Sequence, residues 1–238
     1  MARFDITGGI DPLLSVTLDE GERVLAESNA MVAMDGSLAL KGRTRGGLFK
    51  SIARKFLNDE TFFQQEIVAE DGEGTVLLAP NIPGDVRLLE IGASQYLLSD
   101  GAFLAATSGV TLTTRSQGLG RAFLDDSGGF FVMGTEGSGT LAVSGFGSIR
   151  EIRVTPDRPV FVDNGHLVAW ETTLDYELSI NTGKSGLLGK LVNSQTTGEG
   201  IVLKFRGSGT VLVCSRNKGG FVDWIFASRP TDKAVKNE

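Results

Sequence analysis

The chain of 238 residues contains a single histidine, His166, in the stretch VFVDNGHLVAWE (Val160–Glu171). A histidine beside a carboxylate can act as a general base, and Asp163 lies close to it in the sequence. A catalytic triad would also need a nucleophile, but the sequence holds no G-x-S-x-G motif. A histidine-based metal centre needs two or three histidines, which this chain cannot supply. We therefore expect no catalytic residue, no metal ion and no cofactor.

Paired glycines form a second group of residues that could do chemistry. The stretches GEGTVLL, GSGTLAV and GSGTVLV begin at Gly72, Gly137 and Gly207, and each reads G-x-G-T followed by apolar residues. Glycine loops cradle phosphates when a helix starts directly after them, because the helix N-terminus supplies amides and a dipole. Here β-branched and apolar residues follow, which predicts a strand. We interpret these glycines as structural turns; the full predicted set is Gly72, Gly74, Gly101, Gly137, Gly139, Gly165, Gly207 and Gly209.

Two further elements recur with the G-x-G-T stretches in the same order. The first reads ESNAMVAM from Glu27, SDGAFLAAT from Ser99 and DNGHLVAWE from Asp163. The second lies between the other two and reads GGLFKSI, QGLGRAF and SGLLGKL in residues 46–52, 117–123 and 185–191. Three elements that recur three times predict an internal triplication.

The repeat comparison bears on the histidine, because the positions equivalent to His166 are Ala30 and Ala102. The fold therefore needs no histidine at this position. We expect His166 to be a structural residue that flanks a turn and bonds a backbone group or a subunit neighbour. The alternative is an enzyme that uses His166 together with Asp163.

Turn signals between apolar runs predict the fold class. Val160–Val162 lead into Asp163–Gly165 and Leu167–Trp170 lead out, and a glycine turn between apolar runs is a strong hairpin signal. The 32 glycines are nearly twice the usual share of roughly 7%. Many glycines with only six prolines favour tight turns between short strands. We predict an all-β protein of three similar subdomains.

Short helical insertions are expected between the strands. In the first copy Leu48, Ile52 and Phe56 recur at every fourth residue, which is the spacing of an amphipathic helix. The other two copies allow one or two turns at most. We expect residues 1–228 to form a single compact domain of three pseudo-repeats (about 1–90, 91–156 and 157–228), followed by a flexible tail at 229–238.

The third copy carries a family resemblance. VFVDNGHLVAWETTLDYEL, followed by GEGIVLKFRGSGTVLVCSRN, resembles the family named after altered inheritance of mitochondria, the mitochondrial biogenesis family. The resemblance extends back through GAFLAATSGVTL and GEGTVLLAPNIPGDVRLLEI. It implies three tandem pseudo-repeats of a short double-stranded β-helix, similar to the subunit of the tryptophan-RNA-binding attenuation protein. It also implies a homotrimer whose nine subdomains form a ring with pseudo-ninefold symmetry.

A basic run could contact anions. It contains no acid and comprises Lys41, Arg43, Arg45, Lys50, Arg54 and Lys55. A helix with such a face can lie on an anionic membrane or contact RNA phosphates. The structural alternative is a solvated face, or a surface that packs against the acidic body of a neighbouring subunit. The formal net charge of −6 favours this alternative, because it gives no overall attraction to nucleic acid.

The remaining features favour an ordinary globular protein. A lone cysteine, Cys214, cannot form an internal disulfide, and its setting TVLVCS predicts a small buried side chain in a strand. No apolar run approaches the roughly 18 residues of a membrane span, and we expect a cytoplasmic location. Phe221, Trp224, Ile225 and Phe226 are expected to dock on the core or across a trimer interface.

Our leading hypothesis is a non-enzymatic scaffold or binding protein that forms a homotrimer and that could also bind a protein partner. The runner-up binds RNA or an anionic membrane surface through residues 41–55. An enzyme that uses His166 is the third hypothesis.

Overall fold

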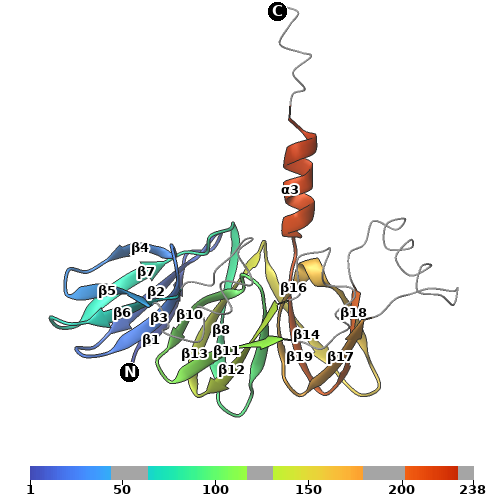
Figure 1. Cartoon of the computed structure of the whole chain (residues 1–238), viewed down its shortest axis with the longest axis horizontal. Helices are drawn as coiled ribbons and strands as arrows, with labels where there is room; N and C mark the ends of the chain where they lie inside the picture. Colours follow the sequence, from blue (N-terminus) through green and yellow to red (C-terminus); the bar gives the residue numbers. More distant parts are fainter. Residues whose placement is uncertain (44–63, 117–130, 179–201, 230–238) are drawn as a thin grey trace, which may run out of the picture.

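The computed structural model describes residues 1–43, 64–116, 131–178 and 202–229 (Figure 1). These residues form nineteen β-strands, one short 3-10 helix and one α-helix, α3 (Lys218–Ala227). The predicted all-β class is therefore confirmed for the described ranges. The helices predicted in residues 46–52, 117–123 and 185–191 lie outside them, as does most of the predicted tail.

The strands form four antiparallel sheets that lie side by side (Figure 1). Sheet 1 has the order β1 (Arg3–Thr7), β2 (Leu13–Leu18), β7 (Gly74–Leu78) and β4 (Met31–Met34). Sheet 2 has the order β5 (Leu38–Arg43), β6 (Gln64–Ala69), β3 (Arg23–Glu27), β10 (Phe103–Thr107), β13 (Gly139–Phe146) and β8 (Gly84–Ile91).

Sheet 3 has the order β11 (Val110–Ser116), β12 (Phe131–Gly137), β9 (Tyr96–Ser99), β16 (Leu167–Glu171), β19 (Gly209–Cys214) and β14 (Ile149–Val154). Sheet 4 has the order β15 (Val160–Asp163), β18 (Val202–Gly207) and β17 (Leu174–Leu178). Two sheets of six strands are thus flanked by two smaller sheets.

Three apolar cores lie between successive sheets. Core 1 joins Leu14 of sheet 1 to Leu104 of sheet 2, and core 2 joins Phe103 of sheet 2 to Leu98 of sheet 3. Core 3 lies between sheets 3 and 4 around Trp170, which is fully buried. Sheets 2 and 3 are therefore covered on both faces, which explains why their strands read as almost continuous apolar runs.

The glycines of the G-x-G-T stretches lie where the chain crosses from one sheet to the next. Gly72, Gly137 and Gly207 have φ values of +118°, +88° and +107°, which side chains rarely adopt. The strands that follow, β7, β13 and β19, lie in a different sheet from the strands that precede them. The predicted turns at these positions are thus corners between sheets.

The hairpin predicted around residues 160–170 is wrong. β15 pairs with β18 in sheet 4, whereas β16 pairs with β9 and β19 in sheet 3. The connection is a 3-10 turn (Asn164–His166) rather than a turn with positive φ. Both strands bury apolar residues, and each obtains its hydrogen bonds in a separate sheet instead of from the other strand.

Of the C-terminal apolar residues, Phe221 packs on the body against Phe146, whereas Trp224, Ile225 and Phe226 do not dock on the core of this chain; docking across a trimer interface stays a prediction. Trp224 is 63% exposed and Phe226 is 55% exposed, because α3 rises away from the strands (Figure 1). Cys214, by contrast, is buried as predicted.

Replacing a corner glycine should destabilise the fold. The Cβ of Gly137→Ala would lie 2.2 Å from the main-chain oxygen of Gly109, at a φ that alanine rarely adopts. We expect a loss of at least about 1–3 kcal/mol in the free energy of unfolding, measured by urea denaturation. Gly9→Ala is the matched control, because its Cβ would meet no atom within 4 Å. Equal midpoints for the two variants would contradict the assignment.

Both tyrosines should ionise late. Burial raises the pKa of Tyr176 to about 12, and burial together with the charges of Glu171 and Glu151 raises the pKa of Tyr96. The unfolded chain ionises its tyrosines near pH 10, so the stability that these phenols contribute is complete below that pH and is lost as the pH rises toward 12. Phenolate absorbance should show a late step that Tyr176→Phe removes. Ionisation of both tyrosines near pH 10 in the folded protein would contradict this placement.

Candidate functional site

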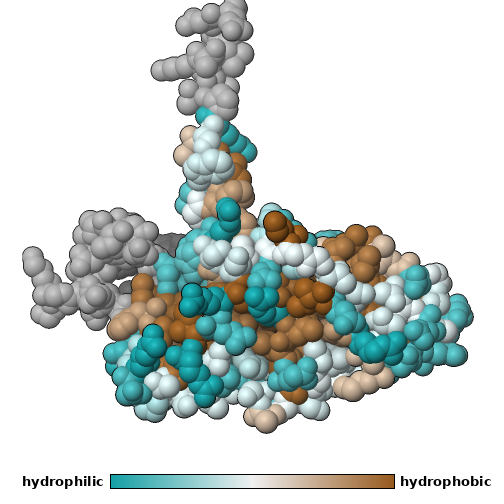
Figure 2. All heavy atoms as spheres, turned by 180° about the vertical axis from the view of Figure 1, so that it is seen from behind, coloured by the Kyte–Doolittle hydropathy of each residue, from teal (hydrophilic) through white to brown (hydrophobic). Residues whose placement is uncertain are grey.

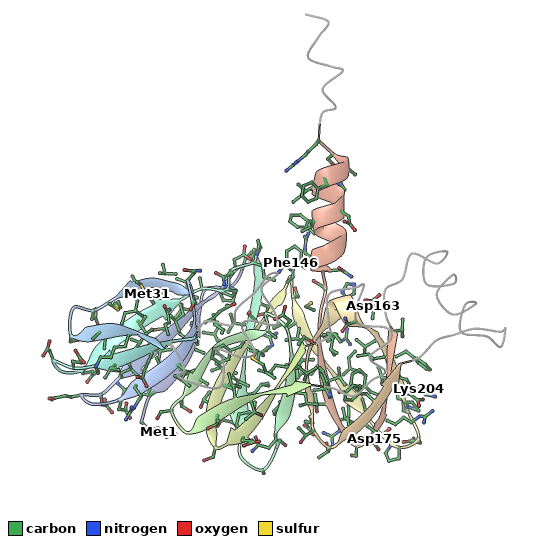
Figure 3. All side chains as sticks on the ribbon, in the orientation of Figure 1. Met1, Met31, Phe146, Asp163, Asp175 and Lys204 are labelled. Carbon is green, nitrogen blue, oxygen red and sulfur yellow. The ribbon has the colours of Figure 1, made fainter. Side chains whose placement is uncertain are left out.

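β4 and β15 are two of the eight strands that end a sheet among the described residues, and they lie at opposite ends of the molecule. β4 pairs with β7 on one side and β15 pairs with β18 on one side, and neither has a second partner among the described residues. Figure 3 shows Met31 of β4 at one end of the row of sheets and Lys204, on the strand next to β15, at the other. Such edges present unpaired backbone N–H and C=O groups that can pair with another chain.

Val32 marks the open edge of sheet 1. It is 54% exposed, whereas Leu104 and Val168, at the aligned positions of β10 and β16, are 0% and 2% exposed. All three strands carry a register shift at this place, against β7, β13 and β19. The local backbone pairing is therefore alike, and what differs is the cover over the side chain.

Phe161 marks the open edge of sheet 4 in the same way. It is 58% exposed, whereas Leu25 and Leu97, aligned on β3 and β9, are 5% and 6% exposed. Leu25 lies on β3, which pairs with β10, and Leu97 lies on β9, which pairs with β16. Neither strand is therefore at the edge of its sheet. Phe161 is covered in part by the ammonium of Lys204, whose nitrogen lies 5.3 Å from the ring centroid.

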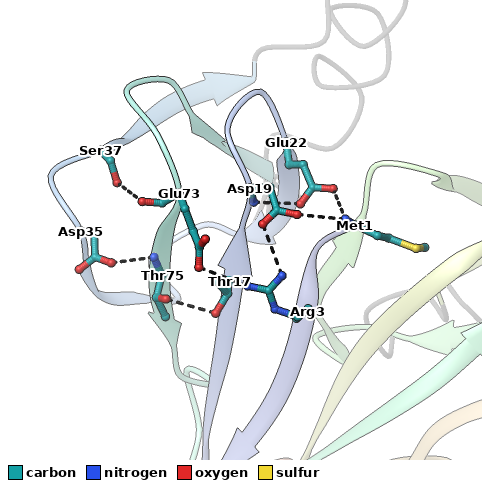
Figure 4. Close-up of polar contacts among 9 residues, drawn as sticks. All are labelled: Met1, Arg3, Thr17, Asp19, Glu22, Asp35, Ser37, Glu73 and Thr75. Carbon is teal, nitrogen blue, oxygen red and sulfur yellow. Dashed lines mark hydrogen bonds and ion pairs between the residues drawn. The ribbon is translucent and has the colours of Figure 1, made fainter.

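Polar contacts fix the end of β4 to its neighbours. The Thr75 amide donates to the Asp35 carboxylate over 2.8 Å, and the Ser37 hydroxyl donates to the main-chain oxygen of Glu73 over 2.9 Å (Figure 4). Arg3 reaches the Glu73 carboxylate from β1 at 3.3 Å. These contacts hold the open edge in a defined position, so that less conformational entropy would be lost when the edge pairs with another strand.

His166 lies at the turn that follows β15. Its Nδ1 is 2.8 Å from the main-chain oxygen of Cys214, so this nitrogen carries the proton in the bond. The Asp163 carboxylate accepts from the amide of Gly165 over 2.7 Å and thereby caps the 3-10 turn. The two residues singled out for chemistry thus lie on one turn, and these bonds tie that turn to β19.

The thiol next to this turn is poorly suited to nucleophilic attack. Burial raises the pKa of Cys214, and its sulfur donates to the main-chain oxygen of Arg216 over 3.3 Å. A neutral, buried thiol reacts slowly because the thiolate is the nucleophilic form. His166 and Cys214 are therefore both hydrogen-bonded to main-chain oxygens.

Replacing His166 should have a small effect on stability. Removing its bond to Cys214 in His166→Ala should lower the free energy of unfolding by about 0.5–1.5 kcal/mol in urea denaturation. A loss above about 3 kcal/mol would contradict the single-bond account, since it would require a buried network around the ring.

The predicted anion-binding run lies mostly outside the described residues. Lys41 is on β5 and forms an ion pair with Glu70, and Arg43 is the last residue of β5. The other four members, Arg45, Lys50, Arg54 and Lys55, fall in residues 44–63. Anion binding by this run therefore stays a prediction, and its first lysine already has an acidic partner.

The part of the chain that the structure describes contains no group of three or more side chains that could hold a metal ion. Its helices include none that is long and apolar enough to cross a membrane. A cleft of about 440 Å³ lies among the turns at the base of α3 and is lined by Glu27, Asp100, Arg216 and Lys218. Its charges of both signs offset one another, so it favours neither an anion nor a cation.

Sequence reasoning missed Val32 and Phe161. Both are ordinary apolar residues in predicted strands, and their exposure depends on where the sheets end. The aligned positions did carry a signal, since Val32 and Phe161 belong to the first copy of one element and the last copy of another. Within the chain, each of these two copies has a neighbouring copy on one side only.

The fold and the site together define an all-β protein of stacked sheets in which an edge strand with an exposed apolar side chain, β4 or β15, lies at each end. Residues 4–216 match the family described as Mitochondrial biogenesis AIM24, and the chain belongs to this family. An uncharacterised protein of Streptococcus pyogenes serotype M6 is 35% identical over 236 residues, which cover 96% of this chain and 92% of that protein.

A solved structure is similar over the same length. The X-ray crystal structure of another Streptococcus pyogenes protein superposes with a TM-score of 0.78 at 33% identity. The match covers 96% of this chain and all of that one. The family membership predicted from the sequence is therefore confirmed, while the comparisons name no activity.

Proposed function

We propose that three copies of this chain close into a ring that acts as a non-enzymatic scaffold or binding module. The observation that carries the proposal is the pair of open edges, β4 and β15, whose exposed side chains are buried at the aligned positions elsewhere in the chain. The number of three follows the resemblance to a triplicated, attenuation-protein-like β-helix fold.

The order of the sheets supports the proposal. Sheets 2 and 3 each consist of two halves of three strands, joined by the pairs β3–β10 and β9–β16. Sheet 4 (β17-β18-β15) resembles one half, and β4-β7-β2 of sheet 1 resembles the other. Pairing β15 of one copy with β4 of the next would produce a six-stranded sheet of the same kind, extended by β1. We accordingly propose that the chain is three pseudo-repeats.

The proposed register follows from the two joints within the chain. Ala105 lies opposite Ala26, and Ala169 lies opposite Leu98. Applying the same offset to the open edges gives three cross-copy pairs: Ala33 with Val162, Met34 with Phe161, and Asp35 with Val160.

Side-chain burial favours the same arrangement. At the β3–β10 and β9–β16 pairs within the chain, Leu25 contributes to core 2 and Leu97 contributes to core 3. Phe161 would likewise enter core 1 of the next copy beside Met31 and Met34, which are only partly buried in this chain. Burying an apolar side chain of this size stabilises an interface by about 1.5–3 kcal/mol.

The interface is head-to-tail, because β15 of one copy meets β4 of another. Head-to-tail interfaces generate a ring when the rotation closes and a filament when it does not. A ring would pair β4 and β15 of every copy, whereas a filament would leave one of each unpaired at its ends as a template for further association. We propose closure for this reason.

Substituting an edge residue should separate the copies without unfolding them. Phe161→Asp places a charge at a position that is mostly exposed in the single chain but would be buried between copies. We expect light scattering to report the mass of three chains for the parent protein and of one chain for this variant. Val32→Asp should behave in the same way.

Leu40→Asp provides the control, because Leu40 is 43% exposed on β5, which belongs to sheet 2 and takes no part in the proposed β15–β4 pairing. This variant should keep the mass of the parent. A parent protein that is monomeric at micromolar concentration, or an unchanged mass in both edge variants, would remove the proposal.

A further inference from the structure

The helix α3 exposes apolar side chains on almost every turn. None of its residues is buried, although its sequence is KGGFVDWIFA. Phe221, Val222, Trp224, Ile225 and Phe226 are all among the exposed large hydrophobic residues. Figure 2 shows hydrophobic side chains along this helix, clear of the body. Contiguous apolar surface of this kind marks a binding site.

The body holds α3 only at its base. The Phe221 ring packs edge-on against Phe146 with centroids 5.2 Å apart, and the Asn217 side chain caps the helix by accepting from the Gly220 amide. Figure 3 shows Phe146 directly below the helix. The first turn contains Gly219 and Gly220, which lower the local helix propensity.

The apolar side chains occupy more than half of the helix circumference. Phe221, Trp224 and Ile225 share one face because they are three or four residues apart, and Val222 and Phe226 widen that face. Lys218, at the first position of the helix, lies on this same side, and the remaining side contains Gly219, Gly220, Asp223 and Ala227. A groove on one protein would leave part of such a wide face in water, whereas the boundary of a lipid bilayer would cover it.

Basic side chains flank α3. Arg216 and Lys218 lie at its base, where they line the same cleft as Glu27 and Asp100, and Arg229 lies just beyond its end, whereas Asp223 is the one acid between them in the sequence. The Arg229 guanidinium lies 4.5 Å from the Phe226 ring centroid, so an aromatic ring and a cation come together at the far end. This segment is basic within a chain of formal net charge −6.

The length of the helix limits how it can bind. Ten residues extend about 15 Å at 1.5 Å per residue, which is half of the roughly 30 Å hydrocarbon core. We propose that α3 lies in the headgroup region of an anionic lipid bilayer, with Asp223 toward water and Arg229 at the lipid phosphates. The contact does not depend on the ring, although a ring would present three such helices on one face and raise the avidity.

Tryptophan fluorescence tests the proposal directly. The chain has two tryptophans, and Trp170 is fully buried while Trp224 is 63% exposed. In a Trp170→Phe protein, emission of Trp224 should shift to shorter wavelength when vesicles of phosphatidylcholine and phosphatidylglycerol are added. Vesicles of phosphatidylcholine alone should bind much more weakly. Equal binding to both kinds would overturn the charged part of the proposal.

A paired variant isolates the helix. Ile225→Ser combined with Phe226→Ser should reduce cosedimentation with the anionic vesicles by at least about tenfold, because two apolar side chains no longer leave water. Ile10→Ser is the matched control, since Ile10 is 92% exposed on the body, and it should bind as the parent does. Far-ultraviolet circular dichroism would verify that all three proteins keep their strands.

Three results would overturn the proposal. The first is no vesicle binding by the parent chain at low salt. The second is equal binding by the parent and the paired variant, which would assign the contact to another surface. The third is a lower mass of the paired variant in light scattering without lipid, which would show that α3 is covered by a second copy. A parent chain that is monomeric but binds vesicles through α3 would remove the ring and keep this proposal.

Discussion

The structure depends on the backbone hydrogen bonds that join the two three-strand halves of sheet 2 and the two halves of sheet 3. The β3–β10 and β9–β16 pairs make sheets 2 and 3 continuous across the joints. Each joint also carries a side chain forward, so that Leu25 contributes to core 2 and Leu97 to core 3. The cores are therefore interdependent, and a sandwich taken alone would expose both a strand edge and an incomplete apolar core.

The same constraint explains why the ends of the chain carry the functional signal. β4 and β15 have the backbone and apolar side chains of joint strands, but the chain offers them no neighbour. In the proposed ring, neighbouring copies would supply for both strands what the internal joints supply elsewhere. Membership of the Mitochondrial biogenesis AIM24 family assigns no activity.

Local sequence patterns predicted some of these features and not others. The G-x-G-T stretches predicted turns because a glycine with positive φ is a local requirement, and Gly72, Gly137 and Gly207 meet it. The hairpin at residues 160–170 failed because a turn signal does not reveal whether the next strand stays in the same sheet. Phe161 was missed because its composition is that of a buried strand residue. The apolar run from Phe221 predicted burial, yet in this chain only its first ring touches the body.

One cross-linking measurement tests the central claim most directly. The double variant Ala33→Cys and Val162→Cys places two thiols opposite each other across the proposed joint, and the native Cys214 is buried and cannot substitute for either. After mild oxidation, denaturing electrophoresis should show covalent species of up to three chains and none larger, and each single variant should show no ladder. Absence of cross-links in the double variant, or a ladder that continues beyond three chains, would contradict the closed ring.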